Sequence, residues 1–212
     1  MIDGKSTRTG IDKRAVDHAV EVRAPGPKHS PSCLGSGLVG DRVCNRRHHG
    51  GDDQAVYAYA REDLDGWQAE LGTPLHGGAF GENLTTVGID VSGARIGERW
   101  RVGAEVVLQV TVPRIPCRTF AVWLDRSGWI RAFLERGAPG AYLRVVAPGM
   151  IAAGDPITVE HRPDHDVTIE RVFRALTLEP ALLPALLVAP ELPDDVADRA
   201  RRRQPIRVDA DL

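Results

Sequence analysis

The chain has 212 residues, of which 42% are hydrophobic and 26% charged, and its formal net charge is −2. These values are close to those of an ordinary globular protein, and the balanced charge gives no basic field of the kind that attracts nucleic acid. No apolar run approaches the roughly 20 residues that span a membrane, and the polar first ten residues show no signal peptide. The sequence therefore predicts neither a nucleic-acid nor a membrane partner.

The first third of the chain combines a weak strand, a long loop and one helix. Apolar residues alternate weakly over 8–24, which predicts a short β segment, and Pro, Ser and Gly crowd 25–40, which predicts a loop. A short strand or turn is expected at 56–60. Leucines and a tryptophan at helical spacing predict an amphipathic helix over 61–71, with Gly72 just beyond its end.

The middle of the chain carries the clearest strand. Valine and leucine alternate over 106–112, and Pro113 and Pro116 end the pattern. A second helix is expected at 129–136, because its apolar residues share one face and Gly137 stops it.

Beyond these elements the pattern turns from β to helical. Two further strands are expected at 141–146 and 156–162, and the composition changes at Pro163. We therefore predict two domains: a mainly β domain over 1–162 and a small all-α domain over 163–212. The three helices of the second domain are expected at 168–177, 180–188 and 193–203.

Two motifs match known patterns in residue type alone. The segment 35–40 reads G-x-G-x-x-G, but no strand precedes it and no helical stripe follows it, so a dinucleotide site is rejected. The side chains of Cys33, Cys44, His48 and His49 are possible zinc ligands, yet their spacing fits no common zinc pattern.

The His48-His49-Gly50-Gly51 segment has two competing interpretations. Glycines let a ligand approach the backbone, and the arginines between residues 42 and 47 would favour an anion there. A polar surface turn explains the same residues, and the segment taken alone favours that simpler interpretation.

Cys117 is the best candidate for a reactive thiol. The three cysteines, an odd number at low density, argue against a disulfide framework and favour the reducing cytoplasm. Arg114 and Arg118 flank Cys117 and favour the thiolate that binds soft metals. A buried structural cysteine at a strand end is the alternative, and the residues alone do not decide between the two. No lysine follows Lys28, so a pyridoxal phosphate enzyme is not supported.

Four segments together resemble the MOSC family, the C-terminal domain of molybdenum cofactor sulfurases. The tail from 167 to 203 further resembles the three-helix domain of stand-alone bacterial members linked to resistance against N-hydroxylated purines. Family members usually carry a further strand before Gly4, and 25–37 looks like an insertion. The four segments are Gly40-Asp41-Arg42, His48-His49-Gly50-Gly51 with Gln54-Ala55-Val56, Gly78-Ala79-Phe80-Gly81-Glu82-Asn83-Leu84 and Pro113-Arg114-Ile115-Pro116-Cys117.

This resemblance implies a mainly β fold, a MOSC-type β-barrel with a few helices, and a bound molybdenum–molybdopterin cofactor. It implies that Cys117 is the protein's ligand to molybdenum. From the chemistry of the residues we expect Asn83 to orient the substrate or a metal-bound oxygen, and Glu82 or His49 to deliver protons. The cofactor-binding residues expected are His48, His49, Gly50, Gly51, Phe80, Gly81, Asn83, Arg114, Pro116 and Arg118.

The activity that the resemblance implies is the reduction of N-hydroxylated compounds such as N-hydroxylaminopurine-type bases and amidoximes. Because the chain shows no flavin, haem or iron–sulfur motif, electrons are expected from a separate reductase of the flavoprotein class. The apolar faces of the C-terminal helices are expected to pack on the barrel or on a second copy of the chain. Two alternatives stay open: a carrier of the cofactor or of sulfur, with a persulfide on Cys117, and an interaction protein without cofactor.

Overall fold

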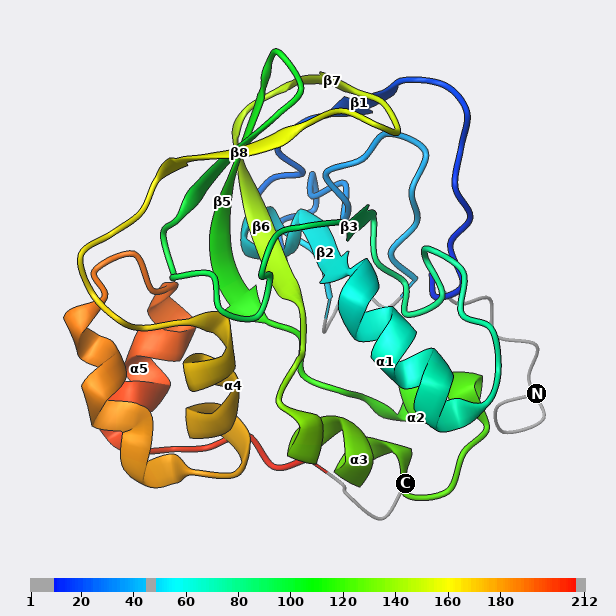
Figure 1. The fold of residues 1–212 in the computed structure, drawn as a ribbon. Coiled ribbons are helices and arrows are strands. Elements are labelled where there is room, and N and C mark those ends of the chain that lie inside the picture. The colour runs from blue at the N-terminus through cyan, green and yellow to red at the C-terminus, as the bar shows by residue number, and fades with distance from the viewer. Residues whose placement is uncertain (1–9, 45–48, 209–212) are drawn as a thin grey trace.

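The structure is a computed structural model that describes residues 10–44 and 49–208. Its centre is a curled, mixed six-stranded sheet that forms a half-barrel, and helices lie at both ends of it (Figure 1). The strands are β1 (Val20–Val22), β2 (Val56–Ala60), β3 (Leu84–Thr86), β4 (Arg99–Val102), β5 (Val106–Pro113), β6 (Ala141–Ala147), β7 (Gly149–Ile151) and β8 (Ile157–His161). The helices are α1 (Arg61–Leu71), α2 (Arg118–Leu124), α3 (Trp129–Arg136), α4 (Ile169–Thr177) and α5 (Asp194–Arg202), with the 3-10 helices η1 (Asp52–Gln54) and η2 (Pro180–Val188).

The sheet has the strand order β3-β2-β6-β5-β4-β8, and β1 pairs separately with β7. Only β2 and β3 run parallel, because α1 connects them, whereas the other neighbours are antiparallel. Register shifts within the β5–β6 pair and the β4–β8 pair mark bulges that help to curl the sheet. The predicted mainly β core followed by helices is confirmed.

The sheet and the C-terminal helices share one apolar cluster. Val106, Leu108 and Val110 of β5 are fully buried in it, together with Val172 of α4 and Leu186 of η2. None of the helices in the described ranges is long and apolar enough to cross a membrane.

A second cluster is aromatic and underlies the loop that contains Phe80. The Phe80 ring contacts Tyr59, Trp67, Phe120 and others at centroid distances of 4.9–6.5 Å. Burial of each such side chain contributes about 1.5–3 kcal/mol to stability. The aromatic cluster therefore stabilises the position of the loop that contains Phe80. The cluster also includes Leu64, Ala79, Ala121, Trp129, Ile130, Phe133, Leu134 and Phe173.

Several elements follow the sequence pattern closely, and others had no clear signal. The helices expected at 61–71 and 129–136 form with those bounds, and the strand expected at 106–112 extends to Pro113. Short elements such as β3, β4 and α2 were not predicted. Helix α2 matters most for the site, because it begins directly after Cys117.

Candidate functional site

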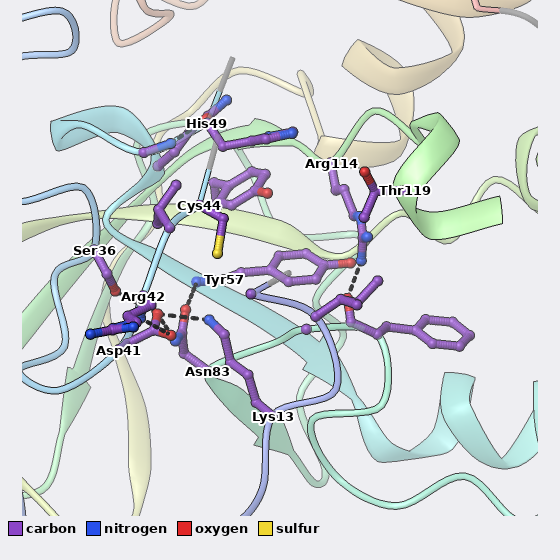
Figure 2. A pocket seen from close by; sticks show the side chains of 18 of the residues that line it. Lys13, Ser36, Asp41, Arg42, Cys44, His49, Tyr57, Asn83, Arg114 and Thr119 are labelled. Carbon is purple, nitrogen blue, oxygen red and sulfur yellow. Dashed lines mark hydrogen bonds and ion pairs between the residues drawn. The ribbon is translucent and has the colours of Figure 1, made fainter. Parts of the chain in front are cut away.

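A cavity of about 480 Å³ opens between β2, β6 and the loops around them. Its volume lies in the range of small-molecule binding sites. Figure 2 shows Lys13, Asp41 and Asn83 meeting in one part of the pocket, and Arg114 and Thr119 in another. The lining residues are Gly10, Ile11, Lys13, Ser36, Asp41, Arg42, Val43, Cys44, His49, Gly50, Gln54, Ala55, Tyr57, Phe80, Gly81, Asn83, Arg114, Cys117, Thr119 and Tyr142.

Cys117 enters this cavity from the end of the strongest strand. Strand β5 stops at Pro113, the next residues run extended, and Cys117 (φ −134°, ψ 166°) directly precedes α2. Its carbonyl oxygen accepts hydrogen bonds from the backbone N–H groups of Phe120 and Ala121, which fixes its backbone. The thiol is free and partly exposed. The alternative of a buried structural cysteine is therefore disfavoured by its position.

Arg114 is a buried cation beside this thiol. The side chain is 8% exposed, and its guanidinium lies over the rings of Phe120 (3.8 Å to the centroid) and Tyr57 (5.2 Å). It donates a hydrogen bond to the carbonyl oxygen of Phe80. Burial acts to lower the pKa of Arg114, but Tyr57, Tyr142 and Cys117 nearby outweigh burial and raise it. The positive charge of Arg114 is thus permanent and lies within electrostatic reach of Cys117.

The Gly50-Gly51 turn forms another wall. A Cβ on Gly50 (φ +88°) would lie 2.5 Å from the carbonyl oxygen of Gly35, so only glycine fits there. The N–H of Gly51 donates to the carbonyl oxygen of Gly35 (3.1 Å) and the N–H of Gly50 to Oε1 of Gln54 (3.1 Å). Gly50 lines the cavity, whereas Gly51 packs against Lys28 behind it.

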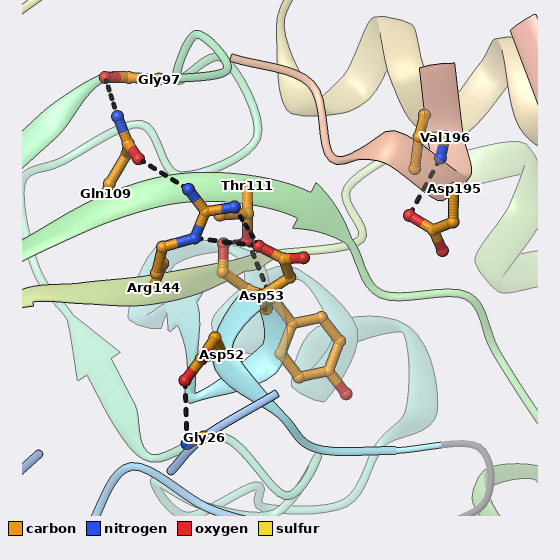
Figure 3. Close-up of polar contacts among 10 residues, drawn as sticks. Gly26, Asp52, Asp53, Gly97, Gln109, Thr111, Arg144, Asp195 and Val196 are labelled. Atoms are coloured by element: carbon orange, nitrogen blue, oxygen red, sulfur yellow. Dashed lines mark hydrogen bonds and ion pairs between the residues drawn. The ribbon is translucent and has the colours of Figure 1, made fainter. Parts of the chain in front are cut away.

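A polar chain fixes the 3-10 helix η1 that follows this turn. Arg144 of β6 pairs with Asp53 of η1 and also contacts Gln109 of β5 (Figure 3). On the other side, Asp52 accepts a hydrogen bond from the N–H of Gly26 (2.9 Å). The glycine turn is therefore attached to the sheet through side chains that the sequence analysis did not consider.

Asn83 and Glu82 are both engaged within the protein. Asn83 accepts a hydrogen bond from the N–H of Tyr57 (3.0 Å) and donates one to Asp41 (2.8 Å). Glu82 is 2% exposed and accepts hydrogen bonds from the N–H groups of Gly78 (2.6 Å) and Phe80 (3.0 Å). Glu82 lies beneath the loop and is not among the cavity-lining residues.

The structure brings most of the predicted site residues to one cavity. Those that line it are His49, Gly50, Phe80, Gly81, Asn83, Arg114 and Cys117. Those that lie outside its lining are Gly51, Glu82, Pro116 and Arg118. His48 falls outside the described residues.

Sequence reasoning assigned no role to several residues of the cavity. Lys13 pairs with Asp41 (2.7 Å), and Ser36 donates to the same carboxylate (2.7 Å). Tyr57 and Tyr142 also line the cavity, and burial raises the pKa of both. The Gly40-Asp41-Arg42 motif was the one signal that pointed to this group, and nothing in the sequence links Lys13 to it.

No group of three or more His, Cys, Asp or Glu side chains that could hold a metal occurs among residues 10–44 and 49–208. A metal bound at Cys117 would therefore draw its other ligands from a cofactor. The lining of the cavity as a whole is rich in cations, with Lys13, Arg42 and Arg114 against the single lining carboxylate of Asp41. The site suits an anionic ligand.

Comparison with known proteins identifies the family. The family model described as MOSC domain matches residues 45–158, and an uncharacterized protein of Bacillus subtilis, YflK, is 31% identical over 168 residues, covering 79% of this chain and 71% of YflK. The chain belongs to the MOSC domain family. The expected resemblance is thus confirmed at the level of the family.

Two further MOSC relatives extend this comparison. YiiM of Escherichia coli is 36% identical over 140 residues, 63% of this chain and 60% of YiiM, and its crystal structure superposes with a TM-score of 0.72 at 26% identity over 92% of this chain and 89% of that one. A protein named Reductase from Gibberella moniliformis is 31% identical over 179 residues, 81% of this chain but only 31% of the fungal protein.

Proposed function

We propose that this MOSC protein binds a molybdenum–molybdopterin cofactor through Cys117 and reduces N-hydroxylated compounds. The observation that carries the proposal is the position of the Cys117 thiol. It is free and partly exposed, and it shares one cavity with Arg114, Gly50 and Asn83. The relative named Reductase supports a redox role.

The residues present fit such a group in three respects. First, Cys117 offers one soft sulfur ligand, and the described part of the chain offers no competing protein cluster. Second, the cations of the cavity suit the phosphate of a pterin cofactor. Third, Gly50 and Gly81 (φ +79°) contribute backbone rather than side chains to the lining, because a Cβ on them would face Gly35 and Ile11.

Each residue has a defined task in the proposed reaction. The cofactor, when bound, supplies the two-electron redox chemistry at molybdenum. Cys117 binds it, and Arg114 holds a permanent positive charge beside it. The Gly50 and Gly81 segments and the ring of Tyr57 position the ligand, and Asn83 fixes the wall through Asp41. The overall reaction, R–NH–OH + 2e⁻ + 2H⁺ → R–NH₂ + H₂O, requires electrons from a reductant and protons from the site.

We further propose that a separate reductase, of the flavoprotein class, supplies these electrons, and that the protein works in the cytoplasm. The subgroup of stand-alone bacterial members with a three-helix tail is part of the same proposal. Elements α4, η2 and α5 lie in the segment that carries this resemblance, and they share an apolar cluster with the sheet through Val172 and Leu186.

The test is molybdenum analysis of the protein expressed in a host that makes the cofactor. We expect metal in the wild type and in Cys33→Ser, because Cys33 is buried away from the cavity lining. We expect its loss in Cys117→Ser. With a chemical reductant, wild type and Cys33→Ser should reduce an N-hydroxylated purine base. Retention of metal by Cys117→Ser would refute the ligand role.

A loaded wild type that reduces no N-hydroxylated substrate would refute the reductase assignment. Sulfane sulfur found on Cys117, with no reduction, would point instead to a sulfur carrier.

A further inference from the structure

A lysine that sequence analysis did not use is built into the cavity wall. The side chain of Lys13 is 22% exposed and its Nζ lies 2.7 Å from Oδ2 of Asp41. Its backbone N–H donates to the carbonyl oxygen of Gly78 (2.9 Å). A Cβ on Gly78 would lie 2.3 Å from the carbonyl oxygen of Lys13. The segment that carries Lys13 is thus fastened to the loop that contains Phe80.

Asp41 fixes the direction of the lysine. Its Oδ2 accepts from Lys13, from Oγ of Ser36 (2.7 Å) and from Nδ2 of Asn83 (2.8 Å). Its Oδ1 accepts from the backbone N–H of Arg42 (2.8 Å). Asp41 is therefore saturated with donors, and one of the three N–H groups of Lys13 is engaged with it. Figure 2 shows the Lys13 ammonium directed at Asp41.

Lys13 has the electrostatic surroundings of a proton donor. Burial lowers its pKa; Asp41 and Glu82 oppose this effect and Arg114 adds to it. Burial acts to raise the pKa of Asp41, but the charge of Lys13 and the hydrogen bonds from Lys13, Ser36 and Asn83 outweigh burial and lower it. Asp41 therefore stays ionised and does not take the proton of Lys13. The carboxylate of Asp41 favours the charged form of this lysine, whereas burial and a second cation disfavour that form. Such a lysine releases its proton more readily than a lysine in water.

The arginines and tyrosines of the lining are less suited to this task. Arg42 and Arg114 do not release protons. Burial raises the pKa of Tyr57 and Tyr142. Apart from the thiols and Asp41, the other lining side chain with an ionisable group is His49, which stays the alternative proton donor.

We propose that Lys13 is the catalytic proton donor of this site and that Asp41 is its positioning residue, an inference that rests on the proposed function. As two electrons arrive from the reductant, the N–O bond of R–NH–OH breaks. The Lys13 Nζ–H bond breaks with it, and that proton goes to the departing hydroxyl oxygen, which leaves as water. The second proton, from solvent, completes the amine. Solvent then reprotonates Lys13 through the open side of the cavity.

The first test measures Lys13 itself. The chain holds only Lys5, Lys13 and Lys28, so NMR of protein labelled at the lysine Cε resolves each titration, and Lys13→Arg assigns the signal. We expect Lys13 to titrate below the pKa of about 10.4 that is usual for lysine, and lower still in Asp41→Asn. Titration of Lys13 at or above the usual value would overturn the proposal.

The second test measures turnover of a molybdenum-loaded protein with an N-hydroxylated purine and dithionite. Removal of a general acid typically costs about 10²–10⁴-fold, so kcat of Lys13→Gln should fall by about 100-fold or more with little change in KM. Lys13→Arg should not restore it, because arginine keeps its proton. In the wild type, kcat should decline as Lys13 deprotonates, and Asp41→Asn should move that decline to lower pH.

Arg14→Gln is the matched control, since Arg14 is exposed, pairs with Asp12 and is absent from the cavity lining. It should leave kcat and its pH profile unchanged, with molybdenum content equal in all variants. A loaded wild type without activity would reject both the proposed function and this role. If the wild type is active and the kcat of Lys13→Gln lies within about threefold of it, the loss is far short of a general-acid effect. That result would reject the role of Lys13 and leave the proposed function standing.

Discussion

Asp41→Asn should destabilise the protein markedly, because it leaves the partly buried ammonium of Lys13 without its counter-charge. Removing one partner of a buried ion pair typically costs about 3–5 kcal/mol. The side chains of Lys13 and Asp41 are 22% and 13% exposed, so solvent partly stabilises the remaining charge, and we expect a loss at the lower limit, about 3 kcal/mol. For a chain of this size that corresponds to a fall in Tm of about 6–12 °C.

A double-mutant cycle separates this charge effect from local packing. Lys13→Met alone leaves Asp41 with its other donors, and Lys13→Met with Asp41→Asn removes both charges. We expect the double variant to be more stable than Asp41→Asn alone, with a coupling energy of about 2 kcal/mol. Thermal unfolding followed by circular dichroism measures all four proteins. Additive losses, with the double variant the least stable, would refute the reasoning.

The same carboxylate predicts the direction of a pH effect. Lys13 and the hydrogen bonds from Ser36 and Asn83 keep the pKa of Asp41 below its ordinary value, although burial opposes them. Between that folded pKa and the unfolded value of about 3.9, the unfolded state binds more protons, so stability rises with pH. The advantage of wild type over Asp41→Asn should therefore be complete at neutral pH and shrink as the pH falls below about 4. An advantage that grows on acidification would contradict this sign.

Three further predictions concern other parts of the site. In thiol labelling of the native protein, Cys44 should react fastest, Cys117 more slowly and Cys33 slowest, in the order of their exposure. Mass spectrometry of the labelled peptides over time measures these rates, and labelling of Cys33 first would disprove the prediction. Arg114→Lys should lower molybdenum retention, because lysine cannot keep the planar stack over two rings together with the hydrogen bond to the loop; metal content equal to wild type would count against it. Phe133→Ala should lower the free energy of unfolding by about 3–5 kcal/mol, since its ring contacts both the aromatic cluster and helix α4. Denaturant unfolding measures this loss. A loss under about 1 kcal/mol would show that the aromatic cluster and helix α4 do not share this core.

The sequence by itself determined the elements that local pattern dictates. Helix α1 follows from the spacing of Leu64 and Trp67 and from the Gly72 stop, and β5 from the alternation of valines up to Pro113. Periodicity and stop residues are local properties, so they can be recognised without knowing the partners. Short elements such as β3 and α2 could not be predicted, because their residues are placed by neighbours that come from other parts of the chain.

In the functional site, too, the sequence predicts some of the residues and only the tertiary structure decides the others. The sequence identified Cys117, Arg114 and the glycine turn, and the MOSC resemblance grouped them. Only the tertiary structure places Lys13 on Asp41 and turns Glu82 inward to the loop. The physical reason is that a side chain's burial and charge partners are set by segments distant in sequence: 28 residues separate Lys13 from Asp41.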